Sequence, residues 1–312
     1  MVRSPVLRIG SRGSPLALAQ VEQVKARLAG AWPELAERGA VAVEIIRTTG
    51  DRIQDRPLSE AGGKGLFTKE IEEALLAGTI DLAVHSMKDM PTVIPDGLEI
   101  ACLLPHEDPR DALIAGVASL AELPQGAVVG TSSLRRKAQV LARRRDLKVV
   151  DFRGNVDTRL RKLERGEVQA TLLALAGLKR LGLEGRASAV LSTEEMLPAV
   201  AQGAIGIETR IGDTRLRAIL APLHHAPTAR AVTAERALLG VLDGSCRTPI
   251  AALAVGRTFG RLRLDALIAT TDGSQVLRTA REGPEADAAE MGRDAGEELR
   301  RDGGPGFFGN SS

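Results

Sequence analysis

Along the first two thirds of the chain, segments with the apolar pattern of a β-strand alternate with segments that have the apolar spacing of an α-helix. Short apolar runs typical of buried strands, such as residues 6–9 and 41–48, are each followed by a stretch with helical spacing. The first helical stretch begins at Ser14 and Pro15, a capping side chain followed by a first-turn proline. This strand–helix rhythm predicts a mostly parallel sheet covered by helices.

The same alternation begins again after residues 108–111. Strands are expected at residues 128–130, 147–151 and 171–175, with helices between them. The segment 204–208 has the character of a strand that returns to the first domain. We therefore expect residues 105–200 to form a second α/β domain, inserted into a first one that spans residues 1–104 and 201–218.

The pattern changes beyond residue 218. Alternating strands are expected at residues 250–255, 262–269 and 276–279, with one helix before them and one after. This order predicts a small α+β domain over residues 219–302. The glycine-rich residues 303–312 are expected to form a disordered tail. The predicted fold class is thus two α/β domains plus a small α+β C-terminal domain.

Composition narrows the possible partners. The 312 residues are 44% apolar and 26% charged, which is typical of a globular protein, and the formal net charge is only +2. Five Phe, one Trp and no Tyr are few for a protein that stacks bases. No apolar stretch reaches the ~18 residues of a membrane span, and Arg3, Arg8 and Arg12 interrupt any signal-peptide core. We expect a cytoplasmic protein without nucleic-acid or membrane partners.

Basic residues are concentrated in one part of the chain. Twelve basic and four acidic residues lie between Thr131 and Arg165. Some of these are expected on solvated helix faces, but four arginines follow expected strand ends, where open α/β sheets bind ligands: Arg135, Arg136, Arg153 and Arg159. Residues 130–133 form a strand-to-helix turn with free N–H groups. Because arginine binds carboxylates and phosphates in a bidentate manner, this pattern predicts an anion site.

Two polar segments leave alternatives open. Residues 62–65 contain Lys64 among glycines but lack the phosphate-loop spacing, so they are either a mobile lid or a plain turn. Lys88 and Asp89 follow an expected strand at residues 81–85. They could bind a zwitterion or stabilise a cationic intermediate, or they could belong to a solvated loop.

The two cysteines have different surroundings in the sequence, and their separation suggests no metal site. Cys102 lies in an apolar run and is expected to be a buried core thiol. Cys246 lies in a polar turn beside Arg247, which favours the thiolate. On spacing alone, however, Cys246 matches an inert loop cysteine better than a nucleophile. His85 is expected to pack or cap rather than bind a metal.

Taken together and in order, these segments resemble the porphobilinogen deaminase family, also called hydroxymethylbilane synthases. The resemblance runs from about Leu7 to Leu299. It rests on eight segments, none of them specific alone: residues 12–17, 62–67, 84–91, 107–111, 130–136, 153–155, 202–204 and 244–246. The chain departs from common family patterns at Glu60, His106, Ala201 and Ser245, and Ala201 stands where glycine is common.

The resemblance implies a transferase of tetrapyrrole (porphyrin and heme) biosynthesis that acts as a monomer. The family joins four porphobilinogen molecules head to tail into hydroxymethylbilane and releases ammonia at each step. It does so on a dipyrromethane primer, which a thioether attaches to one cysteine. The matching cysteine is Cys246, and a soft thiolate suits addition to an electrophilic methylene group.

The resemblance also implies roles for individual residues. Asp89, with Lys88, would be catalytic and would stabilise positive charge on the pyrrole ring. The primer would be held by Lys88, Thr131, Ser133, Arg135, Arg136, Asn155 and Arg159. Incoming porphobilinogen would be bound by Arg12, Ser14, Arg153, Arg159 and Arg180. Lys64 and Phe67 would belong to a lid.

Two rival functions remain at this stage. The resemblance implies two α/β domains like the halves of a periplasmic binding protein, with the cysteine on the small third domain. A binding protein of this two-lobed fold could take up an anion without catalysing a reaction, although the Cys246 loop argues against this. A nucleic-acid-binding module could use the basic segment, and it would show steeply salt-dependent binding.

Overall fold

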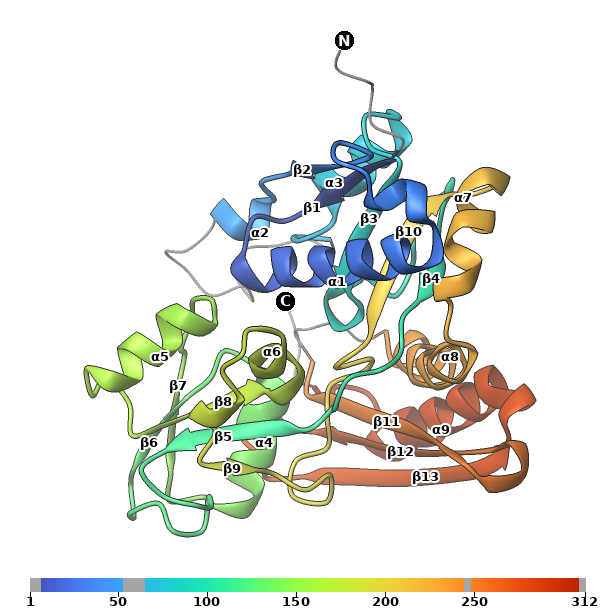
Figure 1. The fold of residues 1–312 in the computed structure, drawn as a ribbon. Coiled ribbons are helices and arrows are strands. Elements are labelled where there is room, and N and C mark those ends of the chain that lie inside the picture. Colours follow the sequence, from blue (N-terminus) through green and yellow to red (C-terminus); the bar gives the residue numbers. More distant parts are fainter. Residues whose placement is uncertain (1–6, 53–64, 244–247, 309–312) are drawn as a thin grey trace. The chain divides into compact units, whose positions relative to one another are not determined.

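The computed structural model describes residues 7–52, 65–243 and 248–308 (Figure 1). These residues divide into two compact units. Unit 1 comprises residues 7–52, 65–106 and 204–229, and unit 2 comprises residues 107–203, 230–243 and 248–308. Each unit is described by itself below.

Unit 1 is built on a mixed five-stranded sheet with the order β2-β1-β3-β10-β4. Its strands are β1 (Leu7–Ser11), β2 (Val41–Ile45), β3 (Leu82–Ser86), β4 (Leu98–Leu103) and β10 (Ile205–Arg210). β1 pairs in parallel with β2 and β3, whereas β10 is antiparallel to both β3 and β4. The helical segments are α1 (Pro15–Ala31), η1 (Pro33–Ala36), α2 (Thr49–Arg52), α3 (Lys69–Leu76), η2 (Met87–Asp89), α7 (Thr214–Leu220) and η4 (Ala221–Leu223).

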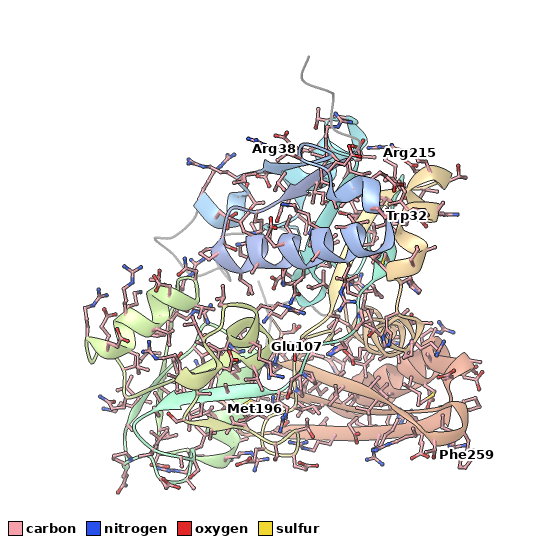
Figure 2. All side chains as sticks on the ribbon, in the orientation of Figure 1. Trp32, Arg38, Glu107, Met196, Arg215 and Phe259 are labelled. Carbon is pink, nitrogen blue, oxygen red and sulfur yellow. The ribbon has the colours of Figure 1, made fainter. Side chains whose placement is uncertain are left out.

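Helices cover both faces of this sheet. Val21, Val24 and Leu28 of α1 pack in one core cluster with strand residues of β1, β3 and β10. Ile71 and Leu75 of α3 pack in another, which includes Ala83 of β3. At the end of α1, the indole N–H of Trp32 donates to the carbonyl of Ile219, 2.9 Å away (Figure 2). The helix stripes predicted from the sequence therefore face the sheet.

Unit 2 contains a second five-stranded sheet, with the order β7-β6-β8-β5-β9. Its strands are β5 (Asp111–Ala115), β6 (Val128–Gly130), β7 (Lys148–Val150), β8 (Ala170–Ala174) and β9 (Ala189–Val190). β6 is parallel to β7 and β8, and β5 is antiparallel to β8 and β9. The accompanying helical segments are α4 (Leu134–Arg143), α5 (Val156–Glu164), α6 (Leu175–Arg180) and η3 (Glu184–Arg186).

The remainder of unit 2 is an antiparallel three-stranded sheet with helices. It comprises β11 (Ile250–Arg257), η5 (Thr258–Gly260), β12 (Arg261–Ala269), β13 (Val276–Pro284), η6 (Glu285–Asp287) and α9 (Ala288–Gly303). α8 (Ala226–Val241) begins in unit 1 and ends in unit 2. Ala251 and Leu267 of the small sheet share a core cluster with Ala138 of α4.

The predicted fold class is confirmed, and the structure adds one detail to it. The strand expected at residues 204–208 does return to the first sheet, as β10 between β3 and β4. The sheets are mostly parallel, as expected, but one strand in each, β10 in unit 1 and β5 in unit 2, runs opposite to the other four. A strand that arrives without a βαβ crossover helix is free to pair in the antiparallel direction.

Candidate active site

In unit 1, three predicted site residues lie at one edge of the sheet. β1, β2 and β3 run in parallel, so their carboxyl ends meet there. Arg12 follows β1, and Lys88 and Asp89 follow β3 in the single turn η2. The structure thus brings together residues that are 76 positions apart in the sequence.

Arg12 is held by two neighbours in unit 1. Its Nε and Nη2 atoms donate to Asp51 Oδ1 at 3.1 and 2.5 Å, and its guanidinium carbon lies 4.2 Å from the centre of the Phe67 ring. Burial raises the pKa of Asp51, but hydrogen bonds and charge from Arg12 outweigh it, so the pKa lies below its usual value. The cationic and aromatic contacts give Arg12 a fixed orientation.

The turn that carries Lys88 and Asp89 rests on the strand β10. The Met87 N–H donates to the carbonyl of Ala204 at 3.0 Å, and the buried Met87 side chain lies against Gly206, where a Cβ would come within 2.1 Å of its sulfur. Lys88 and Asp89 themselves are half-buried. A charged pair is therefore presented from a buried support.

Ser14 has a local structural role. Its hydroxyl accepts a hydrogen bond from the Ala17 N–H at 3.2 Å and caps α1, whose first residue is Pro15. The cap predicted from the sequence is confirmed.

In unit 2, the predicted anion-binding residues also lie at the carboxyl edge of parallel strands. Thr131 and Ser133 follow β6, and Arg153 and Asn155 follow the neighbouring β7. Ser133 caps α4 by accepting from the Arg136 N–H at 3.4 Å, and Asn155 caps α5 by accepting from the Thr158 N–H at 2.8 Å. Two adjacent helix N-termini thus point their N–H groups to this edge.

Arg159 and Arg180 are hydrogen-bonded to main-chain carbonyls in unit 2. Arg159 Nε donates to the carbonyl of Gly154 at 2.7 Å. Arg180 Nη2 donates to the carbonyl of Gly203 at 2.6 Å, and desolvation lowers the pKa of Arg180. Both arginines are oriented by these hydrogen bonds to the main chain.

Arg135 and Arg136 share one buried carboxylate, that of Asp111. Arg135 Nη1 lies 2.8 Å from Asp111 Oδ2, and Arg136 Nη2 lies 2.7 Å from Oδ1. The side chains of Arg135, Arg136 and Asp111 are 5%, 7% and 0% exposed. Burial raises the pKa of Asp111, but the two guanidinium groups outweigh it and hold the pKa far below its usual value.

The charge of this buried group is not balanced. One carboxylate faces two guanidinium groups, and Arg135 Nε is buried with no hydrogen-bond partner among the residues that the structure describes. Gln202 Nε2 donates to Asp111 Oδ1 at 2.9 Å and adds no charge. Arg135 and Arg136 also donate to the carbonyls of Leu197 and Leu172, at 2.8 and 2.9 Å, which add no countercharge.

Sequence reasoning missed both carboxylates that hold these arginines. Asp111 lies in the segment 107–111, which supported the resemblance, but it received no role. Asp51 lies in the polar stretch after β2, and no spacing in the sequence links it to Arg12. Gln202 lies in the segment 202–204, which likewise supported the resemblance without indicating a partner.

Two predicted site residues, Cys246 and Lys64, lie outside the described residues. Cys102 is confirmed as a core thiol: its side chain is buried, and burial raises its pKa to about 12. His85 is confirmed as a packed histidine, buried beside Glu208.

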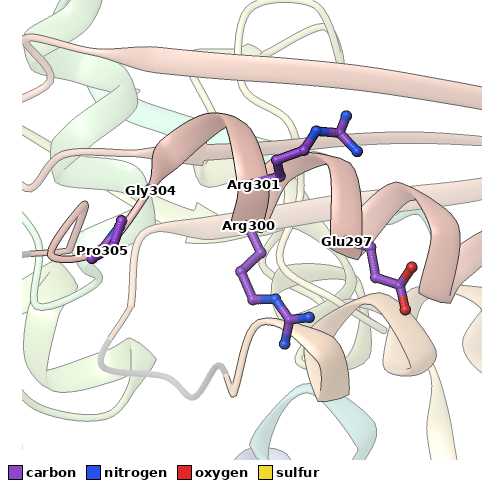
Figure 3. Close-up of a pocket in the computed structure, with 5 residues that line it drawn as sticks. All are labelled: Glu297, Arg300, Arg301, Gly304 and Pro305. Carbon is purple, nitrogen blue, oxygen red and sulfur yellow. The ribbon is translucent and has the colours of Figure 1, made fainter.

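A pocket of about 360 Å³ lies at the end of α9 (Figure 3). It contains none of the predicted site residues, and it is lined by Glu297, Arg300, Arg301, Gly304 and Pro305.

Comparison with known proteins decides the family. A family model described as "Porphobilinogen deaminase, dipyromethane cofactor binding domain" matches residues 7–218, and one described as "Porphobilinogen deaminase, C-terminal domain" matches residues 229–301. The chain belongs to the porphobilinogen deaminase family. The family predicted from the sequence is thus confirmed, and with it the transferase activity and the dipyrromethane cofactor.

Curated porphobilinogen deaminases match nearly the whole chain. The chloroplastic protein of Oryza sativa subsp. japonica is 58% identical over 97% of this chain and 86% of its own length. The protein of Paracoccus denitrificans is 58% identical over 94% of this chain and 93% of its own length. The VFT2 domain of Bordetella pertussis BvgS, a solved structure, aligns with 15% identity and a TM-score of 0.40 over 73% of this chain and 90% of that one. A similarity this low supports no conclusion about the fold beyond the sheet topology described above.

The helices formed by residues 7–52, 65–243 and 248–308 are too short or too polar to cross a membrane.

Proposed function

We propose that this porphobilinogen deaminase holds its primer on the buried arginine pair of unit 2 and acts on incoming porphobilinogen with Asp89 of unit 1. Its reaction, that of a hydroxymethylbilane synthase, joins four porphobilinogen molecules head to tail with loss of ammonia at each step. The observation that carries the division is the unbalanced buried charge of Arg135, Arg136 and Asp111 in unit 2.

The residues of unit 2 suit the dipyrromethane primer. Each pyrrole of the primer carries an acetate and a propionate arm, and the buried arginine pair lacks one carboxylate. When bound, the primer supplies the pyrrole carbon to which porphobilinogen is joined. Cys246 would carry the thioether, and the arms would be held by Thr131, Ser133, Arg135, Arg136, Asn155 and Arg159, with Lys88 from unit 1.

In unit 1, Asp89 would act on the incoming porphobilinogen. Its carboxylate would accept the pyrrole N–H and stabilise the positive charge that develops as the C–N bond breaks and ammonia leaves. Lys88, the neighbouring residue, would add a cation for a carboxylate arm. The buried support of η2 keeps both groups in place.

Substrate carboxylates would be bound by Arg12, Ser14, Arg153, Arg159 and Arg180. Arg12 is already paired with Asp51, so a substrate arm would exchange one carboxylate partner for another. Such an exchange costs little at a pair that water can reach. Phe67, beneath the Arg12 guanidinium, and Lys64 would complete the lid.

We also propose a monomeric, cytoplasmic protein with porphobilinogen as its small-molecule partner. We propose three domains, at residues 1–104 with 201–218, 105–200 and 219–302. The non-catalytic anion-binding protein has no observation in its favour.

Ammonia release from porphobilinogen tests the proposal. The purified protein should release one ammonia per porphobilinogen consumed. Asp89→Asn should retain the primer yet lower turnover by roughly 10²-fold, the scale of a lost acid–base or electrostatic group. Asp81→Asn, a matched control at the opposite end of β3, should turn over like the wild type. Binding of porphobilinogen without ammonia would favour the non-catalytic binder instead.

A further inference from the structure

Two ionisable side chains form a buried pair on the α3 face of the unit 1 sheet. His85 Nε2 and Glu208 Oε2 lie 3.0 Å apart, and the two side chains are 5% and 0% exposed. In the register of β3 and β10, His85 faces Gly206 and Glu208 faces Ala83, which places both side chains on the same sheet face. A hydrogen-bonded pair so deeply buried is held to one geometry.

A third ionisable group, Glu72 of α3, belongs to the same cluster. It is 7% exposed, and burial raises its pKa, an effect to which the charge of Glu208 adds and which His85 opposes. Glu72 Oε1 and Glu208 Oε1 are buried and lack a hydrogen-bond partner within the described part of the chain. The cluster therefore joins three elements, β3, β10 and α3.

Other charged groups on the neighbouring elements are engaged elsewhere. Arg8, in β1, pairs with Asp81, and Arg12, which follows β1, pairs with Asp51. Arg210 of β10 donates to the carbonyls of Leu75 and Ile80 at 2.7 and 2.9 Å. On α3, Glu70 accepts from the Thr49 hydroxyl at 2.6 Å, and Lys69 lies 3.9 Å from Glu73.

His85 of this cluster lies close to the turn η2 along the chain. His85 is the penultimate residue of β3, and Asp89 follows it by four positions. Ser86 accepts a hydrogen bond from Gln20 at 2.7 Å, Met87 rests on Gly206, and its N–H is bound to Ala204 just before β10. Displacing β10 relative to β3 would therefore move the turn.

We propose that the His85–Glu208 pair positions the turn Met87–Asp89, and so sets the placement of Asp89 in the deaminase reaction. The inference rests on the proposed function of Asp89. His85 and Glu208 are positioning residues, which lock the end of β3 to β10, and Glu72 of α3 interacts with both through charge. Misplacing a reacting group by about 1 Å can lower a rate about 10²-fold, so the loss of the pair should show in turnover.

Amide exchange of methionines tests the positioning without reference to activity. The chain has five Met, and Met87 and Met90 flank the turn while Met196 and Met291 lie in unit 2. In full-length protein labelled with ¹⁵N-methionine, Glu208→Gln should speed exchange at Met87 and Met90 at least about tenfold and leave Met196 and Met291 within about threefold. Asp81→Asn should leave Met87 and Met90 unchanged. Unchanged rates at these two sites, or equal acceleration at all four, would overturn the proposal.

Kinetics of the same holoenzymes test the consequence. Glu208→Gln should retain the covalent primer, keep KM within about threefold and lower kcat about tenfold or more, unlike Asp81→Asn. If Glu208→Gln does not fold, His85→Gln removes the other half of the pair and serves in its place. Loosened Met87 and Met90 amides with a wild-type kcat would refute the link to Asp89. A wild type that releases no ammonia would instead refute the proposed function, while the exchange rates still judge the positioning.

Discussion

The two five-stranded sheets have the same arrangement of parallel and antiparallel strands but hold their site arginines in different surroundings. In unit 1, Arg12 and Asp51 are 24% and 28% exposed, whereas in unit 2 Arg135 and Arg136 share an Asp111 that is not exposed at all. A pair that water reaches can exchange partners at little cost, and a buried one cannot. The difference supports the proposal that Arg12 binds an arm of the incoming porphobilinogen and that Arg135 and Arg136 hold the permanent primer.

The largest expected effect is a loss of stability when the carboxylate that pairs with the buried arginines is replaced. Asp111→Asn leaves two buried guanidinium groups without a countercharge and should lower the free energy of unfolding by about 3–5 kcal/mol. Asp51→Asn, its matched counterpart, should lower it by at most about 1 kcal/mol. Urea unfolding of both variants measures this, and equal losses would remove the basis of the comparison.

Replacing one arginine in each unit should distinguish the residues that hold the primer from those that bind porphobilinogen. Arg135→Gln should yield protein without the covalent primer, as intact mass would show. Arg12→Gln should keep the primer and raise KM for porphobilinogen about 10- to 150-fold, which corresponds to a charged hydrogen bond of about 1.5–3 kcal/mol. A primed Arg135→Gln protein with normal turnover would contradict the assignment.

Each unit also contains a buried glutamate, and the two glutamates differ in the partners that surround the carboxyl group. Glu208 has His85 as its partner, whereas Glu235 in α8 accepts hydrogen bonds from the N–H groups of Ala201 and Ala254, 2.5 and 2.7 Å away. Burial raises the pKa of Glu235 from 4.5 to about 8. The stability that the protonated group contributes is complete below about pH 4.5 and is lost as the pH rises to about 8.

Glu235→Gln should therefore flatten the decline of stability between about pH 5 and about pH 8, by at most about 1.4 kcal/mol per pH unit. Unfolding midpoints across that range measure the slope. A slope equal to that of the wild type would mean that Glu235 does not hold its proton there.

The smallest effect concerns the residues that lead into the two antiparallel strands. β5 is preceded by Pro109 and Arg110, but the segment before β10 contains Ala201 at φ 57°, a left-handed conformation that favours glycine. Ala201→Gly should raise stability by about 0.5–1 kcal/mol. Ala187→Gly, at an ordinary φ of −73°, should instead lower it, and thermal unfolding distinguishes the two signs.

The sequence predicted what depends on local pattern. Strand and helix periodicity located most elements, and the strand before Lys88 and Asp89 placed those residues at a sheet edge. The helix cap at Ser14 was predicted by its hydroxyl and the following proline. Each of these features is decided by residues within a few positions of one another.

Long-range pairing could not be predicted in this way. Asp111 meets Arg135 and Arg136 only because β5 joins the sheet beside β8, in the antiparallel direction that periodicity does not reveal. Asp51 meets Arg12 only because β2 lies next to β1. His85 was expected to pack, but its partner Glu208 comes from a strand 123 positions away.

The covalent primer is the central claim, and intact denatured mass tests it most directly. The purified protein should exceed its sequence mass by two condensed porphobilinogen units, and the Cys246→Ala variant should show no excess. A wild-type mass equal to the sequence mass, unchanged after porphobilinogen is added, would contradict the account.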